Sequence, residues 1–404
     1  MNHYVIILGG GLVGQTLALA LDAHGLTSAV IDRAPAEALL DARYDGRVSA
    51  VASASWKMLR AIGLGDALDG KGCPISTIRV SEGLEPGGLD FEPAEDEGPL
   101  GIMFENRLMR ATLFEACRKA ENVSLHMGRS AEAIDRGPGQ VTVTLDDGAQ
   151  LIAPLLIGAE GRGSPTREAA GIKIANWRYG QHAIIACLNH EKPHGHIAYE
   201  IFYPDGPFAI LPMNDDANGH RSALVWSVPE AQGPAMLKLG ERAFLAEAEK
   251  RMGGFLGSVS LAAPRAAYPL GFHNAAKITA HRLALVGDSA HGMHPIAGQG
   301  LNVGFRDVAA LTEVLVEGAR LGLDLADAQL LARYERWRGL DTLMTAMATD
   351  GLTRLFGLPG KPASRLRQFG LNAVSKIPPL QRRFTDEARG TSGKLPLLLQ
   401  GVMV

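Results

Sequence analysis

The stretch YVIILGGGLVGQTLALAL, from Tyr4 to Leu21, decides the fold of this chain. It opens with a continuous apolar run, Tyr4 to Leu8, which is typical of a buried parallel strand. After the glycines, Leu12 to His24 has the length of a helix, and Gly25 stands where that helix would stop. Ser28 to Ile31 is a second apolar strand. A strand, a glycine turn, a helix and a strand in this order predict the βαβ opening of a parallel α/β sheet.

The turn carries the pattern Gly9-x-Gly11-x-x-Gly14. Gly9 permits the tight turn, Gly11 lets backbone amides approach a pyrophosphate, and Gly14 lets the helix lie close to the strand. Asp32 ends the second strand, about where an acid accepts hydrogen bonds from a ribose diol. The alternative is a glycine-rich turn beside a surface aspartate. The motif predicts a dinucleotide site without distinguishing FAD from NAD, so a nicotinamide-dependent dehydrogenase is one rival function.

The composition is that of an ordinary globular protein. The 404 residues are enough for two or three domains. The net charge of −3 gives no global basic field, so we expect no nucleic-acid partner. The three cysteines, Cys73, Cys117 and Cys187, are far apart and form no CxxC pair, so we expect neither a disulfide framework nor a metal site. The N-terminal apolar run contains glycines and lacks a basic leader segment, so we expect a cytoplasmic protein.

The pattern along the chain predicts an α/β nucleotide-binding domain that is split by a sheet-containing insert. Val123 to Ala153 contains short alternating strands and an Asp-Gly turn, which indicate a hairpin. Between about Gln181 and Leu270 short strands recur, with one polar helix near Leu239 to Met252. We expect the nucleotide-binding domain at 1–72, 98–180 and 272–345, a β-rich substrate domain at 73–97 and 181–271, and a basic helical tail at 346–404.

A second motif, VGDSAHGMHPIAGQGLNVGFRD, runs from Val286 to Asp307. Asp288 follows an apolar strand, and carboxyl ends of strands are where α/β folds bind ligands. In the loop from Pro295 to Asn302, glycines leave room for a planar ring against the main chain. The helix that begins near Leu301 would point its N-terminal amides at that ring and stabilise a negative charge there. The motif therefore suits the isoalloxazine of a flavin, and the alternative is a glycine-rich connection without a ligand.

Together these motifs resemble a known family, the single-component FAD-dependent aromatic hydroxylases, and more narrowly the ubiquinone-biosynthesis hydroxylases. HPIAGQGLNVGFRD is similar to the signature of that subgroup, and DGRVSA, ENRLMRATL and GPFAILPM also fit in the expected order. The resemblance covers most of the chain. It implies a Rossmann-like FAD-binding domain of the glutathione-reductase and p-hydroxybenzoate-hydroxylase type, with an inserted β-sheet substrate domain and a helical C-terminal region.

The resemblance also implies which residues bind the cofactor. The pyrophosphate would lie on the three glycines, and the adenosine ribose on Asp32 with Arg33 beside it. Arg47 and Arg107 would lie along the phosphates and the ribityl chain, and Asp288 would bind the ribityl hydroxyls. The flavin ring would lie against the loop residues Pro295, Gly298, Gly300, Leu301 and Asn302.

One motif departs from the family pattern. The family reads Gly-Ala-Asp-Gly followed by Ser and Arg, whereas this chain reads GAEGRGSPTR, with Glu160 in the place of the acid and Ser164 and Arg167 kept. By the resemblance, this motif helps to bind FAD and, transiently, NAD(P)H. The extra methylene keeps the charge but moves it by about 1.5 Å, which puts the docking of the nicotinamide cofactor in doubt.

The reaction that the resemblance implies is hydroxylation of a polyprenylated phenol in ubiquinone biosynthesis. NAD(P)H would reduce the bound FAD, O₂ would add to give a flavin C4a-hydroperoxide, and one oxygen atom would go to the aromatic ring. No residue stands out as the base that activates the phenol. His291 and His294 flank the flavin loop and are candidates for proton transfer, and the alternative for each is a structural role. Tyr199, Tyr203 and Arg221 would either touch substrate or simply pack in the inserted sheet.

The tail from 351 to 385 holds seven basic and no acidic residues, interleaved with apolar ones. Such a segment would lie on an anionic membrane surface, dock a partner in a ubiquinone-biosynthesis complex, or pack on the enzyme body with a solvated basic face. The first of these predicts peripheral attachment at the inner face of the membrane. Two further rivals stay open for the whole chain: a related FAD hydroxylase of another aromatic substrate, and a non-catalytic flavin-binding subunit of a biosynthetic complex.

Overall fold

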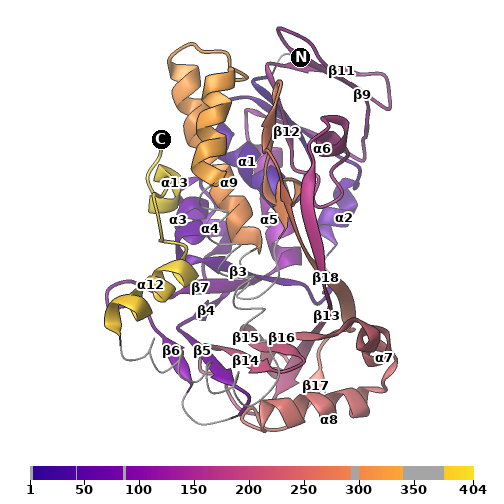
Figure 1. The fold of residues 1–404 in the computed structure, drawn as a ribbon, viewed down its shortest axis with the longest axis vertical. Helices are drawn as coiled ribbons and strands as arrows, with labels where there is room; N and C mark the ends of the chain where they lie inside the picture. Colours follow the sequence, from indigo (N-terminus) through magenta and orange to yellow (C-terminus); the bar gives the residue numbers. More distant parts are fainter. Residues whose placement is uncertain (1–2, 42, 85–87, 293–299, 340–376) are drawn as a thin grey trace.

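In a computed structural model of the chain, the structure describes residues 3–41, 43–84, 88–292, 300–339 and 377–404. A six-stranded sheet forms the centre of the upper part of the molecule (Figure 1). Its strands are, in spatial order, β19 (Thr279–Ala280), β20 (Leu283–Leu285), β12 (Leu155–Gly158), β1 (Val5–Leu8), β2 (Ser28–Asp32) and β8 (Val123–Met127). All neighbours are parallel except β19 and β20. The four residues of β1 are all buried, as a parallel strand covered on both faces requires.

Helices pack around this sheet and complete the main core. Helix α1 packs against both α5 and α9, and α3 packs against α13. Their bounds are α1 (Leu12–Asp22), α3 (Ser53–Ala61), α5 (Asn106–Lys119), α9 (Gly300–Arg320) and α13 (Leu397–Gln400). Shorter helices are α2 (Ala36–Leu40), α4 (Gly65–Leu68) and α6 (Pro165–Ala169). The C-terminal residues thus lie beside a helix from the first part of the chain, as Figure 1 shows.

A nine-stranded sheet forms the lower part of the molecule in Figure 1. Its members are β5 (Thr77–Glu82), β6 (Leu89–Phe91), β13 (Ile174–His190), β14 (Ile197–Tyr203), β15 (Gly206–Asp216), β16 (Gly219–Pro229), β17 (Val259–Leu261), β18 (Ala266–Ala275) and β21 (His291–Gly292). Helices α7 (Gly233–Lys238) and α8 (Glu241–Met252) lie on one face, where Phe244 and Met252 share a buried cluster with Phe208 and Trp226. On the other face, Ala198, Met213 and Ala223 share a buried cluster with Cys73 and Met103.

Two three-stranded antiparallel sheets complete the fold. The sheet β3-β7-β4 lies between the two large parts (Figure 1), with β3 at Val48–Ala52, β7 at Gly101–Glu105 and β4 at Cys73–Ile75. The other sheet consists of β9 (Ala131–Arg136), β10 (Val141–Leu145) and β11 (Gln150–Ala153). Helix α12 (Pro378–Arg389) lies near the edge strand β6.

Most sequence predictions of the fold are confirmed. The βαβ opening forms as expected, and the Asp-Gly turn closes the hairpin of β10 and β11. The polar helix expected near Leu239 to Met252 is α8. The domain limits stay predictions, and β13 runs without a break across the expected limit at 180/181, so the insert and the frame share one continuous strand.

Candidate functional site

The turn after β1 has the shape of a dinucleotide cradle. Gly9 has a φ of +105°, and a Cβ there would lie 2.3 Å from the Ala159 carbonyl oxygen. A Cβ on Gly14 would lie 1.9 Å from the Gly9 carbonyl oxygen, so α1 approaches the strand as closely as only glycine allows. A Cβ on Gly11 would meet nothing within 4 Å, which leaves open space at the N-terminus of α1. Close packing behind the turn and open space in front of it fit the pyrophosphate of FAD.

Asp32 holds this turn from the end of β2. Its Oδ2 accepts the Gly10 N–H at 2.6 Å, and its Oδ1 accepts the Ala34 N–H at 2.7 Å. Each carboxylate oxygen has a second lone pair, so the capacity to accept a ribose hydroxyl remains. Arg33 is exposed next to it. The place of both residues agrees with the expected adenosine-ribose site, and their role stays a prediction.

A fully buried ion network lies beneath the second motif. The Asp307 carboxylate accepts the Gly287 N–H at 2.8 Å and contacts His291 Nε2 at 2.7 Å, and its other oxygen accepts the Arg338 Nε–H at 2.6 Å. Burial alone would raise the pKa of Asp307, but the charges of His291 and Arg338 and their hydrogen bonds lower the pKa below its usual value. The network fixes the Gly287 backbone, and with it the Asp288 side chain, which is partly exposed on the surface above.

His291 is a member of this buried network through its contact with Asp307. The His291 side chain is buried and paired with Asp307, so its position fits a structural role, and a catalytic role for it stays a prediction. His294, Pro295 and Gly298 lie outside the described residues. Sequence reasoning did not select Asp307, although it closes the second motif, because its partners come from the turn before it and from residues 328–339, which are helical.

The first turn of α9 lies against strand β3. Asn302 donates from its Nδ2 to the Ala50 carbonyl and accepts the Ala52 N–H at its Oδ1, both at 2.9 Å. The Asn302 amide therefore attaches the second motif to β3. The sequence did not reveal this contact. Gly300 and Leu301 begin the helix, as expected within one residue. Their predicted place against the flavin ring stays a prediction.

The Glu160 side chain accepts hydrogen bonds from residues a few positions later in the same segment. Its Oε2 accepts the Ser164 hydroxyl at 2.6 Å and the Thr166 N–H at 3.3 Å. Ser164 in turn caps α6 by accepting the Arg167 N–H. The buried Arg167 donates to the carbonyls of Ser289 and Arg162, so this segment is tied to the second motif. The Glu160 carboxylate thus contacts the start of α6.

A cavity of about 430 Å³ lies between the nucleotide-binding part and the nine-stranded sheet. Arg107 and Arg221 both line it, and both pair with Glu105, at 2.5 and 2.9 Å. Met103 and Met213 form an apolar part of the cavity wall. A cavity of this size with convergent polar groups is typical of a small-molecule site. Arg47, the other arginine predicted along the cofactor, forms a partly exposed ion pair with Asp45 away from the cavity lining.

The nine-stranded sheet separates the three substrate candidates. Arg221 lines the cavity, whereas the Tyr199 ring packs against Phe255 with ring centroids 4.4 Å apart. The Tyr203 hydroxyl donates to the Arg251 carbonyl at 2.6 Å. Both tyrosines therefore face the helices on the far side of the sheet. Alternation along a strand was predictable, but the face that meets the cavity was not.

Glu200, between the two tyrosines, is a functional candidate that the sequence did not reveal. Ala198 packs in a cluster with Met103 and Met213, and a residue two positions further on the same strand lies on the same face. Although part of the residue reaches solvent, burial of the carboxyl raises the pKa of Glu200 to about 7. Among the described residues, no charge or hydrogen bond offsets that burial. A carboxyl with this pKa exchanges protons at neutral pH.

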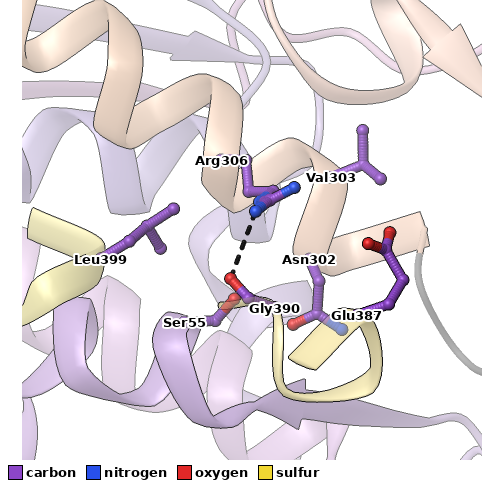
Figure 2. A pocket seen from close by; sticks show the side chains of 7 residues that line it. All are labelled: Ser55, Asn302, Val303, Arg306, Glu387, Gly390 and Leu399. Atoms are coloured by element: carbon purple, nitrogen blue, oxygen red, sulfur yellow. Dashed lines mark hydrogen bonds between the residues drawn. The ribbon is translucent and has the colours of Figure 1, made fainter. Parts of the chain in front are cut away.

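The described end of the tail is attached to the nucleotide-binding part. Arg306 of α9 donates to the carbonyls of Gly390 and Ser392, and Glu313 accepts the Leu397 N–H. Figure 2 shows Arg306 pointing at the Gly390 carbonyl beside a pocket of about 10 Å³, which has room for about one water molecule. The other residues that line it are Ser55, Asn302, Val303, Glu387 and Leu399. This pocket is a packing gap and no cofactor site.

Comparison with known proteins agrees with this geometry. A family model described as FAD binding domain matches residues 2–342. Ubiquinone hydroxylase UbiL of Rhodospirillum rubrum is 46% identical over 401 residues, which cover 98% of this chain and 92% of the relative. The 3-demethoxyubiquinol 3-hydroxylase of Escherichia coli is 34% identical over 389 residues, 96% of this chain and 98% of the relative. Among solved structures, p-nitrophenol 4-monooxygenase PnpA of Pseudomonas putida has a TM-score of 0.79 at 20% identity, covers 97% of this chain and 99% of its own, and shows the fold. The chain therefore belongs to the FAD-dependent aromatic hydroxylases and, within them, to the ubiquinone-biosynthesis hydroxylase family.

Proposed function

We propose that this chain is an FAD- and NAD(P)H-dependent monooxygenase that hydroxylates the ring of a polyprenylated phenol in ubiquinone biosynthesis. The observation that carries the proposal is the cavity of about 430 Å³, whose walls come from both the nucleotide-binding part and the nine-stranded sheet. The names of the two relatives, a ubiquinone hydroxylase and a demethoxyubiquinol hydroxylase, support the substrate class. We place the protein in the cytoplasm.

FAD, when bound, supplies the activation of O₂ after reduction by NAD(P)H. The residues that would hold it are Gly9, Gly11, Gly14, Asp32, Arg33, Arg47, Arg107, Glu160, Asp288, Leu301 and Asn302, with the loop residues Pro295, Gly298 and Gly300.

The chain's own residues would bind the phenol, exclude water from the cavity and transfer a proton. Met103 and Met213 line the cavity with apolar surface that keeps water out. Arg107 and Arg221 line the cavity, and their ion pairs with Glu105 hold the two guanidinium groups in place. Glu200 is on the strand face of Ala198, which clusters with Met103 and Met213, and its carboxyl would take up and release a proton near neutral pH because burial raises its pKa to about 7.

The experiment starts from the purified protein. We expect it to show a flavin absorption spectrum. Under air, a prenylated phenol should accelerate the loss of NAD(P)H and should be converted to a hydroxylated product. Ala111→Phe, which fills part of the cavity from α5, should raise the KM for the phenol at least tenfold and leave the flavin content unchanged. Lys119→Phe, exposed on the same helix, is the control and should change neither. A flavin-containing protein that oxidises no NAD(P)H with any prenylated phenol would instead support a non-catalytic subunit.

We further propose peripheral attachment to an anionic membrane through the tail from 351 to 385. Of this tail, 351–376 lie outside the described residues. In the described part, Ile377 and Phe384 are exposed apolar residues of the α12 region, and Arg382 and Arg383 are exposed beside them. Apolar and basic side chains together are what an interfacial helix offers a membrane. In the parts of the chain that the structure describes, no helix has the length and apolar character to cross a bilayer.

Flotation with anionic liposomes at low salt tests the attachment. The double variant Arg382→Glu/Arg383→Glu should lose at least tenfold in partition, since each basic residue near the surface contributes about 1 kcal/mol. The charge-matched control Lys238→Glu/Arg242→Glu changes exposed residues of α7 and α8, on another side of the molecule from α12 (Figure 1), and should bind as the wild type does. Wild-type protein that does not float would refute the attachment while leaving the monooxygenase proposal intact.

A further inference from the structure

A group of metal-ligating side chains lies outside the cavity, where β4 meets the connection between β13 and β14. Cys73 comes from the start of β4, and His194 and His196 come from that connection. One potential ligand atom of each lies within 4.8 Å of the others, and Cys73 Sγ is 3.5 Å from His196 Nδ1. The sequence predicted no metal site, because Cys73 is far from the histidines along the chain. The tertiary structure brings them together.

The protonation of His194 is set by its surroundings. A carbonyl oxygen only accepts, so the 2.9 Å contact to the Met213 carbonyl means that Nε2 of His194 carries the proton. The lone pair is then on Nδ1, which accepts the His196 N–H at 3.0 Å. Metal-bound histidines in proteins typically donate their other N–H to a carbonyl or carboxylate in this way. The Met213 carbonyl thus prepares Nδ1 of His194 as a ligand atom.

The backbone of the turn places the second histidine. Gly195 has a φ of +62° and His196 a φ of +60°, a conformation that side-chain-bearing residues rarely adopt. The His196 carbonyl accepts the Ser76 N–H at 2.9 Å, which fixes this conformation against β4. Residues held in such a conformation are often at functional sites. Here it puts the exposed His196 ring beside the buried Cys73 thiol, where an ion has access from solvent.

Other histidines nearby are already engaged. His190 uses both ring nitrogens, toward the Lys192 carbonyl and the Ser222 hydroxyl. His220 pairs with Asp215 at 3.0 Å. Among the described residues, the group that could hold a metal ion with Cys73 consists of His194 and His196.

We propose that Cys73, His194 and His196 form a site for a thiophilic divalent transition-metal ion, with Zn²⁺ as the reference ion. The ligand atoms are Cys73 Sγ and the Nδ1 atoms of both histidines, and the fourth position is open to solvent. The 3.5 Å separation of Sγ and Nδ1 matches the edge of a tetrahedron with Zn–S of about 2.3 Å and Zn–N of about 2.0 Å. On binding, the metal–sulfur bond replaces the S–H bond and the thiol proton leaves to solvent. The ion also replaces the N–H contact at Nδ1 of His194.

The ion would stiffen a wall of the cavity. Cys73 packs in one cluster with Met103 and Met213, which both line the cavity, and His194 is bonded to the Met213 carbonyl. Occupation of the site would tie the turn at 194–196 to β4 and so restrain this wall. The inference is independent of the FAD-dependent reaction, and its test does not use turnover.

Calorimetric titration of the full, FAD-loaded and tag-free chain with Zn²⁺ is the test. We expect one equivalent to bind with a Kd in the micromolar range or tighter. His196→Asn keeps a residue that tolerates positive φ and should weaken binding at least tenfold without unfolding the turn. His220→Asn is the matched control and should bind as the wild type does.

Titration with Co²⁺ tests the thiolate ligand directly. We expect visible d–d bands of tetrahedral intensity at wavelengths longer than those of the flavin, and a sulfur-to-cobalt charge-transfer band in the near-ultraviolet difference spectrum against the metal-free protein. Cys73→Ser should lose the charge-transfer band, whereas Cys117→Ser, another buried cysteine, should keep it. A wild-type protein that binds no Zn²⁺ below about 1 mM, or His196→Asn and Cys73→Ser variants that bind as the wild type does, would overturn the proposal.

Discussion

Replacement of Glu200 by glutamine should stabilise the protein, and more so as the pH rises. The carboxyl has an ordinary pKa of 4.5 in the unfolded chain and a pKa of about 7 in the fold, because burial disfavours its charge. Between these values the folded state binds the proton and the unfolded state releases it. The free energy of unfolding of the wild type therefore falls as the pH rises from 4.5 toward 7, and it levels above 7. Glutamine has nearly the same shape and no charge to bury.

The magnitude follows from the interval of about 2.5 pH units between the two values. At about 1.4 kcal/mol for each pH unit, ionised Glu200 costs the fold about 3 kcal/mol at high pH. Near pH 5 that cost is below about 1 kcal/mol, since the unfolded chain is then only partly ionised. The free energy of unfolding of Glu200→Gln should therefore exceed that of the wild type by an amount that grows by about 2–3 kcal/mol between about pH 5 and about pH 8.

Urea unfolding at the two pH values measures this difference. All other titrating groups are shared by wild type and variant, so they cancel when the two proteins are compared at one pH. Glu132→Gln, at an exposed position of β9, is the control and should shift stability equally at both values. A Glu200→Gln variant that is no more stable than the wild type near pH 8 would refute the assignment of a buried, proton-holding carboxyl at this position.

Two further substitutions test the packing under the cofactor site. Asp307→Asn leaves a buried guanidinium without its charge partner and should lower the free energy of unfolding by about 3–5 kcal/mol in urea melts. Glu317→Gln, also in α9 but in a partly exposed ion pair with Arg333, should lower it by less than about 1 kcal/mol, and equal losses would contradict the reasoning. Gly14→Ala places a methyl group 1.9 Å from a backbone oxygen, so α1 must move away from β1. It should weaken FAD binding at least tenfold in fluorescence titration, whereas Gly139→Ala, where a Cβ meets nothing within 4 Å, should not change it.

The nucleotide-binding frame and the family were both predictable from local patterns. The helix between β1 and β2 and the hairpin of β10 and β11 follow from residues that are adjacent in sequence. Gly9 and Gly14 need no side chain because of contacts within the same turn and with the neighbouring strand, so their spacing alone indicated the dinucleotide cradle. The signature after β20 was specific enough to indicate the family that the comparisons confirm.

The groups that face one another across the fold could not be predicted in the same way. Strand alternation placed Tyr199 and Tyr203 on one face and Glu200 on the other, but only the packing of α8 decided which face was covered. Glu105 meets Arg221 because β7 and β16 belong to different sheets that pack together. The sequence by itself thus determined the local geometry of the cofactor cradle, since short-range hydrogen bonds and backbone sterics set it. The cavity, the buried network at Asp307 and the ligands beside Cys73 were decided by tertiary structure, because each requires residues from distant segments whose relative positions depend on long-range packing.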